Sequence, residues 1–184
     1  MDGWHTGRLI VATPALDDPN FERTVILVLD HDEDGALGVV LNRASSVAVE
    51  ETLPPWEHLV AHPAVVFGGG PVEPTAVVAL GRAVAGVAPD GWMPIVDRIR
   101  LVDLDVDPVL AASDLERVRL FAGYAGWAPG QLEDEIAQGA WFVVDATPDD
   151  VFTRDPEGLW HAVLRRQPDE LALLATFPAD PSMN

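Results

Sequence analysis

The sequence contains no cysteine and no lysine, and these two absences exclude several kinds of site. Without cysteine there is no disulfide framework, no thiol nucleophile and no thiolate metal ligand. Without lysine there is no P-loop lysine, and no amine that could form a Schiff base with a carbonyl substrate. Serine is scarce too, and no serine lies in a G-x-S-x-G nucleophile elbow. We therefore expect no catalytic nucleophile, no cofactor and no metal centre.

Long apolar runs are also missing, since none approaches the roughly 18 residues that indicate a membrane span. The first residues show no basic segment followed by an apolar run, so we expect no secretory signal. These features predict a cytoplasmic protein without a membrane partner. A chain of 184 residues predicts one domain spanning residues 1–184, with a loose tail over residues 178–184.

Basic residues are few: 30 acidic residues face 11 basic ones, which gives a net charge of −19. Such a charge repels nucleic acid at long range, so we expect no direct nucleic-acid contact. It favours a basic protein partner instead. Arginines close in sequence could form a local basic patch, although pairing with the surplus carboxylates is the favoured interpretation. These arginines are Arg98 with Arg100, Arg117 with Arg119, and Arg165 with Arg166.

Segments rich in valine, isoleucine and leucine recur between turn signals and predict strands. The predicted strands are residues 8–13, 24–30, 36–41, 64–67, 75–81 and 98–103, with residues 120–123 and 141–144 as two further candidates. The loop between the second and third predicts an antiparallel hairpin over residues 24–41.

Helical signals gather toward the C-terminus. Leu132 and Ile136 give residues 131–138 an apolar side, and the acids between them are expected on the other side. Thr147 predicts a helix start with Pro148 at its first position. Residues 159–166 and 169–175 predict two more helices. Strands first and helices later indicate an α+β fold.

Three segments together resemble one protein family. They are ATPALDDPNFERTVILVLDHDEDGALGVVLNR (residues 12–43), VVFGGGP (residues 65–71) and FAGYAGWAPGQLEDEIAQGAW (residues 121–141). With these motifs the chain resembles the AlgH/YqgE family of small bacterial proteins over nearly its whole length. The resemblance implies a mixed, strongly bent β-sheet forming a pseudo-barrel with flanking helices. The AlgH name also implies an association with transcriptional regulation, which does not require contact with DNA.

The acidic loop contains Asp30, Asp32 and Asp34 in the D-x-D-x-D-G order of a calcium loop. Leu41 stands where the closing glutamate should be, so a solvated hairpin tip is the favoured interpretation. His31 lies among these acids and could act as an acid/base group, although a surface histidine is the usual outcome.

Two glycine-rich segments could shape a ligand site. Gly69 and Gly70 could present backbone N–H groups to an anion, or could form a tight turn that passes close to another segment, which is favoured. Tyr124 and Trp127 could line a groove, or could fill the end of the barrel at a strand-to-helix corner, which is also favoured.

Asn42 and Arg43 follow the hairpin and could face an anion together. The alternative is turn capping by the asparagine and a surface ion pair of the arginine. The surface that we expect to meet a ligand or partner therefore comprises His31, Asn42, Arg43, Gly69, Gly70, Tyr124 and Trp127.

Three functions remain open. The first is a non-enzymatic binding or regulatory protein that acts through a protein partner. The second is a small-ligand-binding protein or hydrolase-like enzyme, with its site where the two glycine-rich segments meet the acidic hairpin. The third is a homodimer that uses an unpaired strand edge or an exposed tryptophan patch around Trp4, Trp56 or Trp92.

Overall fold

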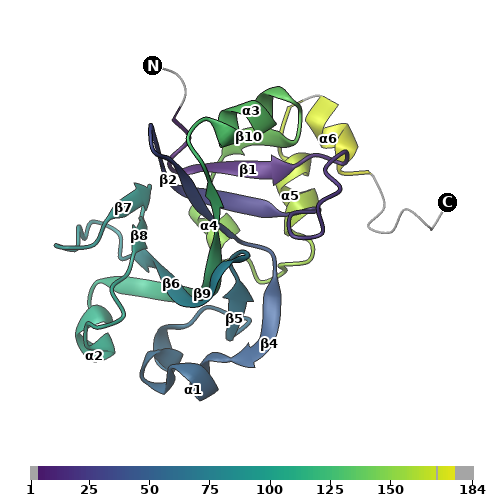
Figure 1. The fold of residues 1–184 in the computed structure, drawn as a ribbon. Helices are drawn as coiled ribbons and strands as arrows, with labels where there is room; N and C mark the ends of the chain where they lie inside the picture. The colour runs from purple at the N-terminus through teal and green to yellow at the C-terminus, as the bar shows by residue number, and fades with distance from the viewer. Residues whose placement is uncertain (1–3, 169, 177–184) are drawn as a thin grey trace.

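The computed structural model describes residues 4–168 and 170–176, which form a curled β-sheet with helices around it (Figure 1). The predicted tail over residues 178–184 lies outside the described residues. The strands are β1 (Arg8–Ala12), β2 (Val25–Asp32), β3 (Gly35–Val40), β4 (Ala44–Ala48), β5 (Val65–Gly68), β6 (Val72–Ala83), β7 (Pro94–Val96), β8 (Ile99–Leu101), β9 (Leu115–Trp127) and β10 (Trp141–Asp145).

The sheet runs in the order β10-β1-β2-β3-β9-β6-β8-β7, and neighbouring strands are antiparallel. A second branch, β4 paired with β5, joins β9 through the parallel β5–β9 pair. The long strand β9 thus contacts β3, β5 and β6, and it joins the two halves of the sheet. This architecture confirms the expected α+β fold with a mixed, strongly bent sheet.

Short helices pack around the sheet (Figure 1). They are α1 (Val49–Thr52), the 3-10 helix η1 (Pro54–Leu59), α2 (Pro108–Ala111), α3 (Gln131–Ala137), α4 (Pro148–Val151), α5 (Leu159–Arg165) and α6 (Glu170–Leu174). The predicted helices near residues 131, 148, 159 and 170 are present. Thr147 begins α4 as expected, because its N–H donates to Asp150 Oδ2 at 2.7 Å in a capping box.

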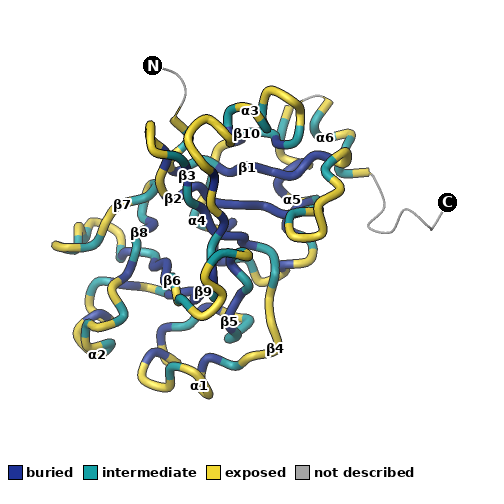
Figure 2. Tube along the Cα trace, in the orientation of Figure 1, coloured by how far each residue is buried: buried dark blue, intermediate teal, exposed yellow. Residues whose placement is uncertain are grey.

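Strands β1 and β2 are buried on both faces, which explains their continuous apolar runs. In β1, Leu9 and Val11 face the core under α5, whereas Ile10 and Ala12 face the core under α3. Figure 2 shows β1 buried along its length, while β4 is exposed. A third core fills the space between η1, α2 and the β6–β9 ladder.

Two of the sequence expectations about strands were incomplete. Strands β4 and β7 were not predicted, because Ala44–Ala48 has only one large apolar residue, Val47, and Pro94–Val96 has only three residues. Strand β9 begins at Leu115, five residues before the predicted start, since Glu116, Arg117 and Arg119 interrupt its apolar pattern.

The expected tryptophan patch is not formed. Trp56 is buried at 2 % exposure in the third core, and Trp92 is only partly exposed. Of the three, Trp4 alone is largely exposed, at 50 %. Among the described residues, we also find no helix that combines the length and the apolar character needed to cross a bilayer.

The side chain of Arg119 is fully buried, although it extends from the middle of β9. Its guanidinium donates to three backbone carbonyls: Val151 O at 3.0 Å, Thr153 O at 2.8 Å and His62 O at 2.8 Å. It also lies 4.3 Å from the centre of the Phe67 ring. Burial lowers the pKa of Arg119 to about 10, so the group remains charged at neutral pH. One side chain therefore ties β9 to the segments that precede β5 and follow α4.

Replacing Arg119 with methionine should lower the free energy of unfolding by about 2–4 kcal/mol, because three carbonyls lose their donor in a buried place. Urea denaturation of the purified protein measures this change. The free energy of unfolding of Arg119→Lys should fall between those of the parent and Arg119→Met, since one ammonium can reach some of these carbonyls. Arg165→Gln is the matched control, because Arg165 is exposed, and it should change stability by less than about 0.5 kcal/mol. An Arg119→Met protein as stable as the parent would contradict this role.

Candidate functional site

The two glycine-rich segments meet in the structure. A Cβ atom added to Gly69 would lie 2.2 Å from Gly123 O, and one added to Gly70 would lie 2.2 Å from Tyr124 O. Only glycine fits at this approach of two backbones. The N–H of Gly69 donates to Ala122 O at 2.8 Å, so it is already engaged. These contacts support the tight-turn interpretation of the glycine run.

Asn42 and Arg43 do not act as a pair. The Asn42 side chain accepts from Val25 N at 3.0 Å and donates to Arg23 O at 2.8 Å, so it holds the base of the hairpin. The Arg43 guanidinium instead donates to Pro19 O at 3.2 Å and Glu22 O at 3.3 Å. Within the described residues it makes no ion pair with a carboxylate, so the expected surface ion pair is wrong for Arg43.

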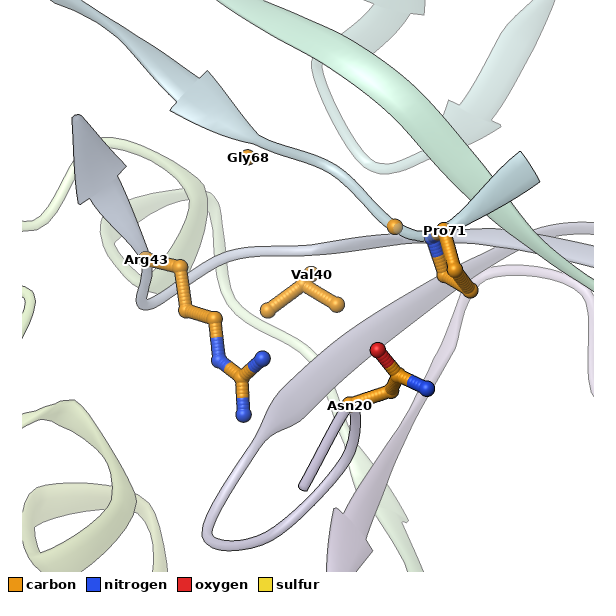
Figure 3. A pocket seen from close by; sticks show the side chains of 6 residues that line it. Asn20, Val40, Arg43, Gly68 and Pro71 are labelled. Carbon is orange, nitrogen blue, oxygen red and sulfur yellow. The ribbon is translucent and has the colours of Figure 1, made fainter. Parts of the chain in front are cut away.

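Arg43 borders a small hollow of about 170 Å³ (Figure 3). Its lining comes from the loop before β2, the end of β3 and the glycine run: Asn20, Val40, Arg43, Gly68, Gly70 and Pro71. Figure 3 shows the Arg43 guanidinium and the Asn20 amide on either side of Val40. The hollow therefore combines a cation and an amide with an apolar floor, a set that suits a small carboxylate.

His31 is not on the surface, which corrects the expectation from sequence. It is 4 % exposed, and its Nε2 lies 3.1 Å from Glu133 Oε1 on α3. The backbone N–H of His5 donates to His31 Nδ1 at 3.2 Å. Because Nδ1 accepts, the proton of the neutral ring is on Nε2, which donates to Glu133. His31 thus ties the acidic hairpin to α3 and the N-terminal segment.

Trp127 is also buried, at 6 % exposure, with its Nε1 donating to Glu135 Oε2 at 2.9 Å. The indole of Trp141 donates to the same oxygen at 2.8 Å. Glu135 was expected on the solvent side of its helix, but one carboxylate oxygen here satisfies two buried indoles. No sequence signal marks Glu135, apart from the need of buried tryptophans for an acceptor. These contacts support packing as the role of Trp127.

Tyr124 lies beside Glu73, with the two side-chain oxygens 3.4 Å apart. Partial burial, and then the neighbouring Glu73 carboxylate, raise the pKa of the Tyr124 hydroxyl. The hydroxyl therefore stays protonated at neutral pH and cannot serve as a base.

The acidic loop is a hairpin tip between two strands, as predicted. The N–H of Asp34 donates to Asp32 Oδ1 at 2.8 Å, which stabilises the turn. Asp30, Asp32 and Asp34 border a hollow of about 250 Å³ with Trp127. In residues 4–168 and 170–176, no three His, Asp or Glu side chains are grouped so that they could hold a metal ion.

The largest of these hollows is an apolar groove of about 410 Å³ beside β4, far from the acidic tip in the sheet order. We refer to it as the β4 groove. Its lining residues are Ser45, Val47, Thr52, Val66, Phe67, Gly68, Thr75, Val77 and Ala122. Val47 is 45 % exposed and Val77 is 41 % exposed, so apolar surface faces outward here.

The curled mixed sheet and these surface hollows identify a class of α+β proteins. They do not identify a reaction. A family model described as AlgH-like matches residues 9–172. A UPF0301 protein of Streptomyces avermitilis is 56 % identical to this chain, over 97 % of the chain and 95 % of the relative. One of Thermobifida fusca is 52 % identical over the same shares. The chain belongs to the AlgH-like family.

Two solved structures share the fold. A protein from Corynebacterium diphtheriae has a TM-score of 0.90 at 39 % identity, covering 94 % of this chain and 92 % of that one. The AlgH protein from Pseudomonas aeruginosa has a TM-score of 0.71 at 29 % identity, covering 98 % and 97 %. These matches confirm both the resemblance and the bent sheet that it implied.

The His5 side chain provides a test of the contacts around the buried His31, whose ring lies beside the His5 ring. Burial, then the neighbouring His31 and Arg8, lower the pKa of His5 below its ordinary value, while Glu133 opposes the shift. A proton-detected NMR titration should therefore place the His5 midpoint below about 6.5. Because the folded-state pKa is depressed, His5 contributes stability above pH 6.5 that is lost as the pH falls.

Glu133→Gln removes the only one of these neighbours that raises the pKa, so it should move the His5 midpoint lower still. Asp134→Gln is the matched control on the same helix and should leave the midpoint in place. A His5 midpoint at or above the ordinary histidine value would contradict this arrangement of charges around His5.

Proposed function

We propose that this protein is a non-enzymatic binding protein that takes an extended segment of a protein partner along strand β4. The observation that carries this proposal is the β4 groove, which lies beside a strand paired on one side only. Among the described residues β4 pairs with β5 alone, and residues 44–47 are exposed. A strand with a free edge over an apolar floor suits the addition of a strand from another chain.

The ladder between β4 and β5 is loose, and no strand of the described residues pairs with the opposite edge of β4. Cα partners occur only at Ala44 with Phe67 and at Ala48 with Val65. Between them, Ser45 Oγ donates to Val66 O at 2.5 Å and replaces a ladder bond. An added strand would find its hydrogen-bonding groups on the outer side of β4 and its apolar contacts at Val47.

The charges around the groove indicate the chemistry of the partner segment. Glu51 directly precedes the lining residue Thr52, and Glu73 lies two residues before the lining residue Thr75; both acids are exposed. The whole chain also carries a net charge of −19. The partner segment should therefore carry apolar side chains at alternate positions, flanked by arginine or lysine.

The separation of the predicted site residues supports binding over catalysis. The glycine run and Arg43 border one hollow, whereas the acidic tip and Trp127 border another. The acids and histidine of the hairpin therefore do not face the backbone amides of the glycine run. A regulatory role that acts through a protein partner fits this arrangement and needs no contact with DNA.

Selection from a random heptapeptide phage library tests the proposal. Enriched peptides should alternate apolar residues and carry flanking basic residues, and a synthetic peptide of that consensus should slow amide hydrogen exchange over residues 44–48. Val47→Glu should weaken its binding at least about tenfold, because Val47 lies on β4 itself and the variant places an unpaired carboxylate against the apolar side chains of the peptide.

Val109→Glu is the matched control, because Val109 is 73 % exposed on α2 and lies outside the groove. Its affinity for the peptide should equal that of the parent. A library without a consensus, or binding that survives Val47→Glu unchanged, would refute the docking of a partner strand at β4.

The Arg43 hollow favours a second candidate function, the binding of a small carboxylate ligand. Within the described residues no carboxylate neutralises the guanidinium, and the hollow has room for one small anionic group. Titration with acetate or succinate should shift the amide resonances of Gly68 and Gly70, and Arg43→Gln should abolish these shifts. Equal shifts in the variant would exclude this ligand site.

A further inference from the structure

Three of the 11 arginines border one hollow, on the other side of β9 from β5. This arginine hollow measures about 300 Å³ and is lined by Arg82, Arg117, Asp149, Phe152, Thr153 and Arg154. In so acidic a chain, a convergence of guanidinium groups from three segments needs a physical explanation. Its volume lies at the lower end of the range for small-molecule sites, about 300–1,000 Å³.

A β-bulge brings two of these arginines together. Ala83 pairs with Leu115 and Arg82 pairs with Arg117, so Glu116 is the extra residue on β9. A β-bulge changes the direction of the side chains beside it, and here both Glu116 and Arg117 lie opposite Arg82. Glu116 forms ion pairs with two arginines: its Oε1 lies 2.6 Å from Arg98 NH1, and its Oε2 lies 3.4 Å from Arg82 Nε.

The third arginine is held in place by the buried Arg119. The carbonyls of Val151 and Thr153 accept from the Arg119 guanidinium, which fixes the backbone on either side of Phe152. Arg154 is the next residue and is exposed at the rim of the hollow. The wall of the arginine hollow is therefore anchored by a buried charged group, and its position does not depend on a surface loop alone.

The charges around the hollow do not cancel. Arg82 and Arg98 share Glu116, and Arg82 also pairs with Asp149 through NH1 and Oδ1 at 3.0 Å. Within the described part of the chain, the Arg117 and Arg154 side chains make no ion pair and no hydrogen bond. The Arg82 Nε is buried and donates no hydrogen bond in the same part of the chain. Four arginines thus face two carboxylates, which leaves local positive charge at the hollow.

We propose that the arginine hollow binds the phosphate group of a small molecule. Guanidinium groups match phosphate oxygens in geometry and bind them with two parallel hydrogen bonds. Arg117 on β9 and Arg154 in the segment after α4 supply the free donors, and Arg82 at the same hollow pairs with Asp149. Asp149 is exposed and forms an ion pair with Arg82, so it competes with the phosphate for this guanidinium.

A phosphorylated small molecule is favoured over a nucleic acid because of the surrounding charge. A single phosphate or pyrophosphate group fills the hollow, whereas an extended polyanion would also meet the field of a chain with a net charge of −19.

Isothermal titration calorimetry with pyrophosphate and with inorganic phosphate, at low ionic strength, tests the proposal. Arg117→Gln and Arg154→Gln together should weaken pyrophosphate binding at least about tenfold, since each loses a charged hydrogen bond. Arg100→Gln with Arg165→Gln removes the same net charge elsewhere and should leave the affinity within about twofold of the parent. Circular dichroism confirms that each variant is folded.

Asp149→Asn provides the decisive variant, because it should strengthen binding. Removing the competing carboxylate from Arg82 should raise the affinity for pyrophosphate about fivefold. Absence of pyrophosphate binding by the parent, unchanged affinity in the Arg117/Arg154 variant, or no gain in Asp149→Asn would each overturn the proposal. An oligonucleotide that binds more tightly than pyrophosphate, with the same dependence on these arginines, would overturn it in favour of a nucleic-acid surface.

Discussion

The buried guanidinium of Arg119 is the interaction on which the arrangement of this molecule depends. β9 is the strand shared by both branches of the sheet, and Arg119 extends from its middle. Its hydrogen bonds to the His62, Val151 and Thr153 carbonyls connect that strand to two distant segments. A buried charge is costly unless its donors are satisfied, and NH1 and NH2 of Arg119 are satisfied by these carbonyls, whereas its Nε has no hydrogen-bond partner among the described residues. The same contacts determine where Phe152 and Arg154 lie.

β9 also explains why the hollows described above lie apart from one another. At its C-terminal end it pairs with β3, and there Trp127 and the acidic tip lie together. In its middle it pairs with β5, beside the β4 groove. At its N-terminal end the bulge at Glu116 turns Arg117 toward Arg82. One bent strand thus separates acidic, apolar and basic surfaces, each with its own chemistry.

Much of the fold could be predicted because it is encoded locally. Residues 24–41 form two apolar runs around an acidic, glycine-containing turn and pair as a hairpin, and Thr147 with Pro148 begins a helix by capping chemistry that needs no distant partner. The site was less predictable. His31 and Trp127 belong to motif segments, yet both are held inside by carboxylates of α3: Glu133 lies 102 residues after His31, and Glu135 lies 8 residues after Trp127. Acids spaced along a short helix carry no sign of which buried ring they will meet.

The sequence by itself determined the class of strands and helices, the family and the excluded chemistries, because apolar periodicity, turn residues and missing side chains are local properties. Only the tertiary structure decided which arginines pair with carboxylates and which remain available. Arg98 and Arg166 meet carboxylates as expected, whereas Arg119 meets backbone carbonyls and Arg117 faces a hollow. The physical reason is that electrostatic pairing depends on distances of a few ångströms between segments far apart in sequence, which are fixed by strand register and by one bulge.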